Sequence, residues 1–134
     1  MKVSLSTEPI RREEILSSIR SESSGAIVTF TGTVRKTESG DLESLFYEAY
    51  EEMAVKEMQK ICRDALKRFS ITDIAMSHRI GNIVIGDESV FIAVSAPHRK
   101  EAFLACEYAI DSLKKSVPIW KKDVYRDSGR DMKK

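Results

Sequence analysis

The sequence is poor in cysteine and histidine and has no long apolar run, and each scarcity excludes a class of protein. Its two cysteines, Cys62 and Cys106, make no disulfide framework and no metal-ligand spacing. Its two histidines lie far apart, which argues against a structural zinc site. No apolar run approaches the ~20 residues that cross a bilayer. The first residues also lack the apolar core of a signal peptide, so we expect a cytoplasmic protein with no metal and no membrane contact.

The sequence also lacks a large excess of charge. The formal net charge is +1, which gives no global electrostatic case for binding nucleic acid. The charge is uneven, because the segment 37–57 holds seven acidic residues against one Lys, whereas 111–134 holds eight basic against four acidic residues. Two solvated faces would explain this pattern. A basic C-terminal part that meets an anion would explain it equally well.

What is present is enough apolar sequence for one core. The chain has 134 residues and is 42% hydrophobic, which suits one domain over 1–134 and is too little for two. No repeat or low-complexity segment interrupts it. Nothing in it matches a phosphate-binding P-loop, a dinucleotide-binding fingerprint or a serine triad.

Apolar periodicity predicts a chain of alternating strands and helices. Strands are expected at Lys2–Leu5, Ala26–Val34, Leu45–Tyr50, Ile71–Arg79, Ser89–Ala96 and Ile119–Tyr125. Helices are expected from a cap at Ser6 or Thr7 to about Ile19, over Met53–Phe69, and over Lys100–Lys115. The two glycines of GNIVIGDE indicate a hairpin or small subdomain. The order predicts an α+β fold with an antiparallel or mixed sheet, helices packed on one face, and a small β subdomain.

Three local features carry more specific expectations. Gly32 inside a strand suggests a bulge or a close backbone approach. Cys62 shares an apolar helical face with Met58 and Ile61. Cys106 shares one with Phe103, Ile110 and Leu113, so both thiols are expected in the core, where a thiol is inert.

The first candidate site is the lysine pair Lys114 and Lys121. Lys114 lies in the last turn of a predicted helix and Lys121 on the following strand, and Pro118 between them forces the chain to turn. Both amines could therefore face one pocket, where lysine suits nucleophilic or acid–base work. The competing explanation is that basic residues at a helix C-terminus oppose its dipole.

The second candidate site is His98 with Arg99, at the start of a predicted helix, where free N–H groups favour a phosphate. Arg35, at the end of a strand, could position an anion or be solvated. His78 with Arg79 is interpreted as a turn with a structural polar contact. Trp120 could stack on a ring, although an aromatic residue on a final strand is usually in the core.

Read together, these residues fall in five blocks that resemble one known family. The blocks are GAIVTFTGTVR (25–35), LFYEAYEEMA (45–54), HRIG (78–81), GDESVFIAVSAPHRKEAF (86–103) and DSLKKSVPIWKK (111–122). In order and spacing they resemble the signature blocks of the large, catalytic subunit of molybdopterin synthase, the MoaE family. The fold that this resemblance implies is α/β hammerhead-like.

The resemblance implies a sulfurtransferase without a bound cofactor. Such an enzyme converts cyclic pyranopterin monophosphate to molybdopterin by adding two sulfurs as a dithiolene. The sulfur arrives as a thiocarboxylate on the C-terminal Gly-Gly tail of a small ubiquitin-like subunit. Large subunits form a homodimer, and one small subunit docks at each end to give a heterotetramer.

The resemblance also implies roles for individual residues. Lys121 matches the family's catalytic lysine, and Lys114 matches the lysine that meets the partner's glycine tail. Arg35, His98 and Arg99 match the substrate phosphate pocket, which lies near the dimer interface, so that both chains are candidates to line it. Phe30 matches a pocket-lining aromatic. Family members commonly continue past the position of Lys134, and Arg130 is the candidate for part of that segment's work.

Two other functions fit some of these residues. A non-catalytic module that binds a phosphorylated ligand and regulates a partner would need Arg35, His98 and Arg99 but not Lys121. A lysine enzyme that forms a Schiff base with a carbonyl substrate would need a lysine but no protein partner. Borohydride trapping without a partner would identify the second of these.

Overall fold

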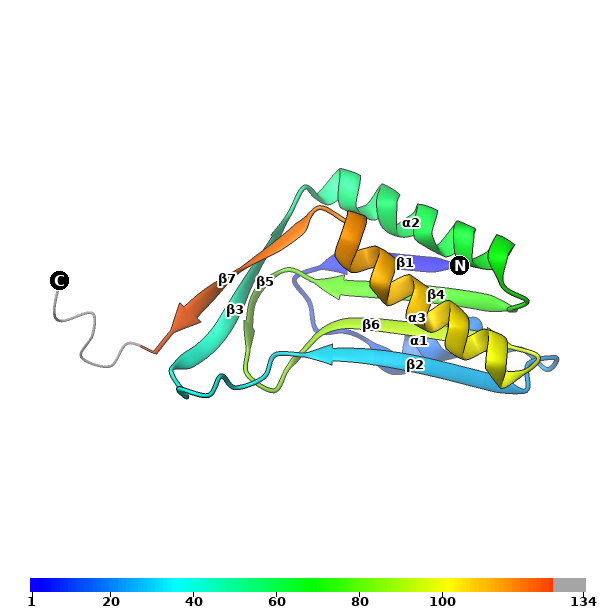
Figure 1. Cartoon of the computed structure of the whole chain (residues 1–134), viewed down its shortest axis with the longest axis horizontal. Helices are drawn as coiled ribbons and strands as arrows, with labels where there is room; N and C mark the ends of the chain where they lie inside the picture. The colour runs from blue at the N-terminus through cyan, green and yellow to red at the C-terminus, as the bar shows by residue number, and fades with distance from the viewer. Residues whose placement is uncertain (127–134) are drawn as a thin grey trace, which may run out of the picture.

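The computed structural model describes residues 1–126, which form two β-sheets and three helices (Figure 1). The larger sheet has four strands in the spatial order β1-β4-β6-β2. These strands are β1 (Lys2–Ser6), β4 (Asp73–Arg79), β6 (Glu88–Ala96) and β2 (Ala26–Thr33). β1 and β4 are parallel and the other pairs are antiparallel, so the sheet is mixed.

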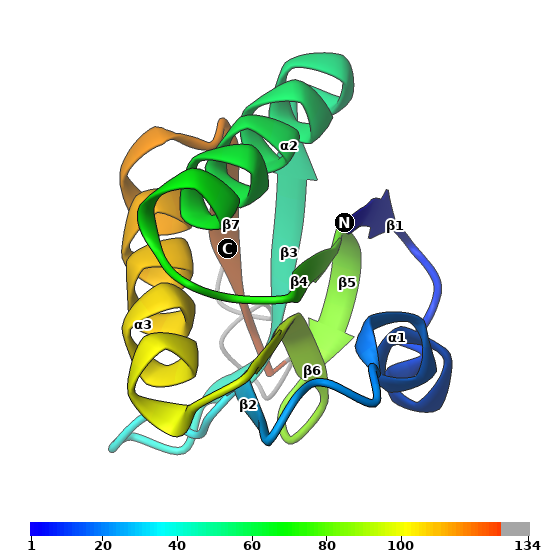
Figure 2. The same cartoon turned by 90° about the vertical axis from the view of Figure 1, so that its right-hand side faces the viewer.

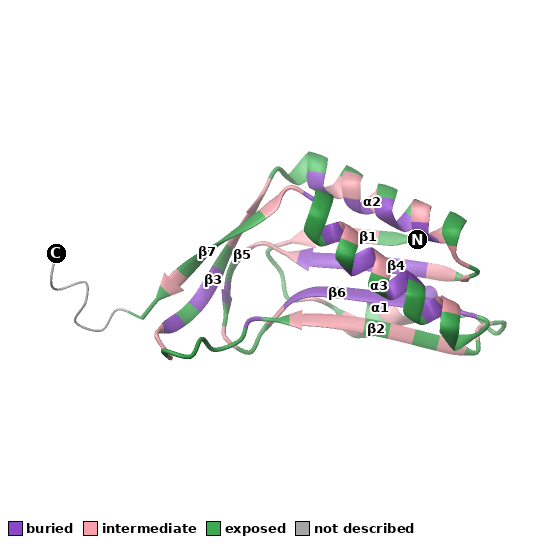
Figure 3. Cartoon of the chain, in the orientation of Figure 1, coloured by how far each residue is buried: buried purple, intermediate pink, exposed green. Residues whose placement is uncertain are grey.

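β6 is one of the two inner strands of the larger sheet and is buried from its second residue to its last. Its sequence is a nearly continuous apolar run, which is typical of a strand covered on both faces. Figure 3 shows β4 and β6 buried along most of their length. Alternate residues of β6 therefore supply two separate cores, one above and one below the sheet.

Helices α2 (Glu51–Arg68) and α3 (Arg99–Ser116) cover one face of this sheet. The fully buried Met58 and Cys62 of α2 and Ala109 of α3 pack over it, each at 0% exposure. Full burial of an apolar side chain of Met size contributes roughly 1.5–3 kcal/mol, so this layer dominates the core. The two long helices thus confirm the predicted helical layer.

Helix α1 (Arg12–Ile19) lies on the opposite face, as Figure 2 shows. Its Ile15 and Ile19 pack against Ala75, Phe91 and Ala93. These three residues have the opposite pleat orientation to those beneath α2 and α3. The expectation that all helices share one face was therefore wrong for α1, because β4 and β6 are apolar on both sides.

α1 also begins later than predicted. Ser6 ends β1, and its hydroxyl accepts a hydrogen bond from the Glu8 N–H at 2.8 Å. That contact makes a local turn in place of a helix cap. The helix does not start at Ser6 or Thr7, because this turn and the strand consume those residues.

The smaller sheet confirms the predicted β subdomain. Its strands lie in the order β5-β3-β7, all antiparallel. They are β5 (Gly81–Val84), β3 (Leu42–Ala49) and β7 (Ile119–Tyr125). A separate apolar cluster, which includes Leu45 and Ile83, holds this sheet together. In Figure 1 it stands at the end of the larger sheet, beyond the last turn of α3.

Two side chains depart from their predicted burial. Phe103 was expected in the buried stripe of α3, but it is 60% exposed, while Cys106, Ile110 and Leu113 are buried. Trp120 is not core either, because it is 41% exposed and meets Tyr50 edge to face at 5.1 Å. Periodicity locates the apolar stripe of a helix, but not the width of the surface that covers it.

Candidate functional site

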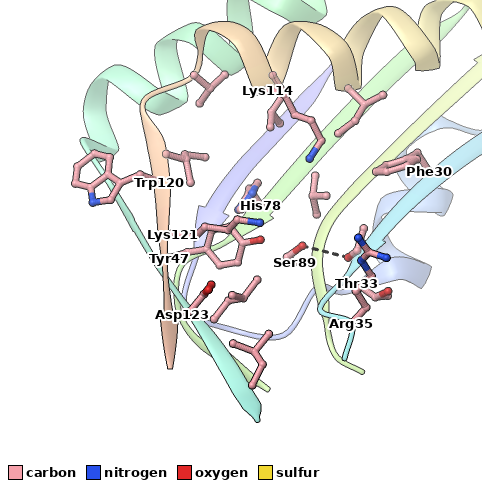
Figure 4. Close-up of a pocket in the computed structure, with 18 of the residues that line it drawn as sticks. Phe30, Thr33, Arg35, Tyr47, His78, Ser89, Lys114, Trp120, Lys121 and Asp123 are labelled. Carbon is pink, nitrogen blue, oxygen red and sulfur yellow. Dashed lines mark hydrogen bonds between the residues drawn. The ribbon is translucent and has the colours of Figure 1, made fainter. Parts of the chain in front are cut away.

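A cavity of about 890 Å³ lies where the two sheets meet the C-terminal end of α3 (Figure 4). Its lining comes from β2, β3, β4, β6, α3, β7 and the connection between β2 and β3. Side chains that can bind or react dominate it. They include Phe30, Arg35, Tyr47, His78, Lys114, Lys121 and Asp123. Sequence segments more than 80 residues apart thus meet in one place.

The turn at Pro118 brings the two predicted lysines to this cavity. Lys114 stands in the last turn of α3, and the helix closes when the Val117 N–H donates to the Leu113 carbonyl at 3.2 Å. The Pro118 carbonyl then accepts the Tyr50 N–H at 3.2 Å, which ties the turn to the start of α2. The turn therefore fixes where β7 leaves α3.

β7 presents Lys121 to the cavity because of its register. Lys121 pairs with Tyr47 of β3, and Asp123 pairs with Leu45. Alternate strand residues share a face, so all four line the cavity. Lys122 points to the other face, where its ammonium lies 3.1 Å from a Glu48 carboxylate oxygen. The two adjacent lysines therefore occupy different environments.

Arg35 and Phe30 lie on the wall across from Lys121 in Figure 4. The chain reaches Arg35 through a bulge at Gly32, where the pairing of β2 with β6 shifts register. A Cβ at Gly32 would lie 2.6 Å from a Val90 methyl carbon, so only glycine fits this close approach. The predicted bulge is confirmed, and it redirects the chain that carries Arg35.

His98 and Arg99 do not line this cavity in the single chain. His98 is the N-cap residue of α3 and Arg99 its first residue, and both are exposed. Arg99 and Lys114 are separated by roughly 22 Å along the helix, at ~1.5 Å per residue. The structure thus gathers Phe30, Arg35, Lys114 and Lys121, and leaves the other two predicted site residues at the opposite end of α3. Arg130 lies outside the described residues.

His78 lines the cavity, although its position at a strand end predicts only a structural polar contact. It is only 5% exposed, and its Nδ1 lies 2.6 Å from the Arg79 carbonyl oxygen. Burial lowers its pKa from 6.5 and the Lys114 charge lowers it further, against the hydrogen bond to Arg79. The signal for it was its step of two from Ile74 and Met76, which places it on the helix-covered face at the end of β4.

The cysteines lie in the helical layer and do not line the cavity. Burial raises the pKa of Cys62 to about 12 and that of Cys106 to about 11. A thiol with such a pKa holds almost no thiolate at neutral pH. The described residues also hold no group of three or more His, Cys, Asp or Glu side chains arranged to bind a metal ion. No helix in residues 1–126 is long and apolar enough to cross a membrane.

We expect the double variant Cys62→Ala, Cys106→Ala to keep its turnover in the sulfur transfer that the family resemblance implies. It should lose ~1–2 kcal/mol of unfolding free energy through lost packing. Turnover well below the melting temperature and chemical denaturation would measure the two effects separately. A folded double variant without activity would contradict this expectation and point to a persulfide on one of the thiols.

Comparison with known proteins identifies the family. The family model described as MoaE protein matches residues 5–116, which is most of the chain. The chain belongs to the MoaE family. Among curated MoaE relatives, the molybdopterin synthase catalytic subunit of Pyrococcus abyssi is 47% identical over 126 residues, covering 92% of this chain and 85% of the relative.

Solved structures agree with this assignment to the MoaE family. The crystal structure of molybdopterin synthase from Staphylococcus aureus superposes with a TM-score of 0.87 at 43% identity, covering 92% of this chain and 91% of that one. A complex of subunits 1 and 2 of molybdopterin-converting factor from Helicobacter pylori matches with a TM-score of 0.75 at 25% identity, covering 95% and 86%. These matches confirm the predicted fold class and the family resemblance.

Proposed function

We propose that this chain is the catalytic subunit of a molybdopterin synthase. In this role it transfers two sulfurs from a thiocarboxylated small subunit to cyclic pyranopterin monophosphate. The observation that carries the proposal is the meeting of Lys114, Lys121 and Arg35 around one cavity in a chain of the MoaE family. The cavity provides cations for both an acyl group and a phosphate. Its volume of about 890 Å³ lies within the ~300–1,000 Å³ of small-molecule sites, so it has room for both groups.

Lys121 is the catalytic residue of this proposal. When sulfur leaves or joins the acyl carbon of the small subunit, negative charge develops on the acyl oxygen. A cation held by the β3–β7 pairing stabilises that charge without moving. The opposite wall of the cavity provides Arg35, whose guanidinium suits the substrate phosphate. Phe30 beside it offers an apolar surface for the pterin ring.

Lys114 is the residue proposed to meet the partner's C-terminal tail. The last turn of a helix carries negative dipole potential, so Lys114 is stable there without another partner. An extended Gly-Gly tail is narrow enough to reach a lysine inside a cavity. The basic balance of the C-terminal part of the chain suits a tail that ends in a carboxylate or thiocarboxylate.

His98 and Arg99 enter this proposal through a second copy of the chain. They lie roughly 22 Å from Lys114, since a helix rises ~1.5 Å per residue, and so cannot join the same cavity. In a two-fold homodimer, the start of α3 in one protomer can approach the cavity of the other. Each phosphate site would then consist of Arg35 from one chain and His98 with Arg99 from its partner.

The test of this function is reconstitution. The purified chain is incubated with a thiocarboxylated small subunit and cyclic pyranopterin monophosphate, and dithiolene formation is measured. A small subunit with an ordinary C-terminal carboxylate is the control. A phosphate-binding regulatory module would bind the pyranopterin but form no dithiolene in either reaction.

We expect binding of the small subunit to depend on its last two glycines. Lys114 should contact that end directly, so removal of both glycines weakens the complex by tenfold or more, which corresponds to loss of ~1.5–3 kcal/mol from one charge-assisted contact. Calorimetric titration with full-length and shortened partners measures this. Lys114→Ala should weaken binding of the full-length partner in the same way, and Lys115→Ala is its matched control. Equal affinities of the wild-type chain for the full-length and shortened partners would remove the tail from the binding model.

We also expect Arg35→Ala, His98→Ala and Arg99→Ala to raise the KM for the pyranopterin. Deleting one charge-assisted hydrogen bond to a phosphate costs roughly 1.5–3 kcal/mol, or about tenfold or more in KM. Partner binding should change much less. Steady-state kinetics on the three variants gives KM, and unchanged values in all three would place the phosphate elsewhere.

A further inference from the structure

His78 is held in one orientation at the inner end of the cavity. Its ring meets Tyr47 edge to face, with 5.1 Å between the ring centroids. Its β-sheet neighbours in register are Leu5 on β1 and Val90 on β6, which present apolar surface. Figure 4 shows the ring between Lys114 and Lys121, on the wall where the two sheets meet.

The hydrogen bonds of His78 define its tautomer. A carbonyl oxygen can only accept, so Nδ1 must donate to Arg79 across the 2.6 Å contact. In the neutral ring the other nitrogen, Nε2, then carries a lone pair and no hydrogen. Within residues 1–126 this nitrogen has no hydrogen-bond partner, and it is not fully buried. His78 therefore presents a free proton acceptor at the cavity.

Burial, together with the nearby charge of Lys114, keeps this ring neutral. The titratable groups that line it with His78 are Tyr47 on β3, Lys114 on α3, Lys121 and Asp123 on β7, and Arg35, Lys36 and Glu38 on the β2–β3 connection. Four cations thus outnumber two carboxylates. Burial and the Lys114 charge lower the pKa of His78 below 6.5, so a proton is absent from Nε2 at neutral pH.

The chemistry of sulfur transfer requires such a group, and this step rests on the proposed function. Once the sulfur of the thiocarboxylate has bonded to the pterin, the acyl carbon of the small subunit is linked to it as a thioester. Release needs an oxygen on that acyl carbon, and water is the available source. A water nucleophile must lose a proton as it attacks.

We propose that His78 is the general base that activates this water through Nε2. One proton passes from water to Nε2, the water oxygen bonds to the acyl carbon, and the carbon–sulfur bond breaks. The sulfur stays on the pterin as a thiolate, and the small subunit leaves as a carboxylic acid that gives the second water proton to solvent and becomes a carboxylate. His78 returns the first proton to solvent or to the thiolate. No electrons are gained or lost.

Other lining groups are less suited to this role. Lys114, Lys121 and Arg35 are cations at neutral pH and have no lone pair to accept a proton. Glu38 and Asp123 are exposed, and Asp123 already accepts a hydrogen bond from the Tyr125 hydroxyl at 3.0 Å. A buried imidazole with a fixed tautomer is better placed than an exposed carboxylate, because its lone pair is oriented before substrate arrives.

The test uses His78→Gln and His78→Ala in the complete complex with the thiocarboxylated small subunit. General-base loss typically costs ~10²–10⁴ in rate, so we expect kcat to fall at least 10²-fold while KM changes less than about twofold. The acid limb of the wild-type pH–rate profile, below pH 6.5, should disappear. Mass spectrometry of the denatured reaction should show the small subunit accumulating as a covalent conjugate with the pterin.

Chemical rescue separates base catalysis from a structural role. Added imidazole should restore part of the rate of His78→Ala, since the substitution leaves space in the cavity wall. Ser77→Ala is the matched control on the same strand, because the Ser77 hydroxyl bonds to the Ser4 hydroxyl at 2.7 Å on the other face of the sheet. It should turn over like the wild type.

A second measurement does not depend on whether the His78 variants fold. When only this chain carries the histidine label, nitrogen NMR of the wild-type complex has two rings to resolve, and comparison with His98→Ala assigns them. We expect His78 to be neutral at pH 7 with its hydrogen on Nδ1. A charged ring or a hydrogen on Nε2 would overturn the proposal.

The remaining outcomes are also decisive. Unchanged kcat in both His78 variants, or a fall in kcat with neither conjugate nor imidazole rescue, would overturn the role of His78. Wild-type protein that makes no dithiolene would instead overturn the proposed function. The two failures are therefore distinguished within one set of assays.

Discussion

Lys121→Ala should abolish sulfur transfer while leaving the fold and the partner complex intact. Loss of a group that stabilises developing charge typically lowers the rate ~10²–10³-fold. The residue is exposed and makes no ion pair among the described residues, so its removal should hardly change the free energy of unfolding. Single-turnover formation of dithiolene in the reconstituted system measures the effect.

The neighbouring lysine is the matched control for this prediction. Lys122→Ala removes the same charge from the same strand, but its side chain pairs with Glu48 on the face away from the cavity. It should keep nearly full activity. Lys121→Arg retains a cation that cannot act as a nucleophile, so partial activity in that variant would indicate electrostatic catalysis. Near-normal turnover of Lys121→Ala would remove the role proposed for Lys121.

Mixing two defective variants should restore activity at pyranopterin concentrations well below the KM of the phosphate-site variant. One variant is Lys121→Ala, and the other carries His98→Ala with Arg99→Ala. If each site takes Lys121 from one chain and His98 with Arg99 from its partner, a mixed dimer has one intact site. Random exchange makes about half of the dimers mixed, so about a quarter of the wild-type rate should return.

The measurement for this mixing experiment is turnover after subunit exchange. Each variant assayed alone gives the baseline, and a mixture of Lys121→Ala with Lys114→Ala is the control. Those two residues belong to the same cavity of one chain, so neither cavity of the mixed dimer contains both wild-type lysines. This control mixture should therefore stay at baseline. If the first mixture stays at baseline although exchange is complete, His98 and Arg99 do not act across the dimer.

Most elements of the fold were predictable because their signals are local. The apolar stripes of α2 and α3 and the β-branched run of β6 appear directly in the order of residues. The failures were of a different kind. α1 occupies the face opposite to the expected one, and Phe103 is exposed, because both outcomes depend on which surfaces happen to meet.

The site was only partly predictable for the same reason. Lys114 and Lys121 could be paired from sequence because Pro118 turns the chain between them within a few residues. His78 could not be joined to them, since β4 and β7 belong to different sheets and meet only through the cavity. Arg35 was a candidate from its place at a strand end, and the family resemblance added Phe30. Their distance in sequence from the lysines gave no sign that both lie on the opposite wall.

The sequence by itself determined the family, the α+β class and the identity of the cationic residues. These depend on residue order and short-range periodicity, which a single chain records directly. Only the tertiary structure decided which of those residues share a cavity, which lie at the far end of α3, and that a buried imidazole stands between two lysines. Such proximity follows from the packing of two sheets against a helix end, and packing sums many weak contacts that no local segment encodes.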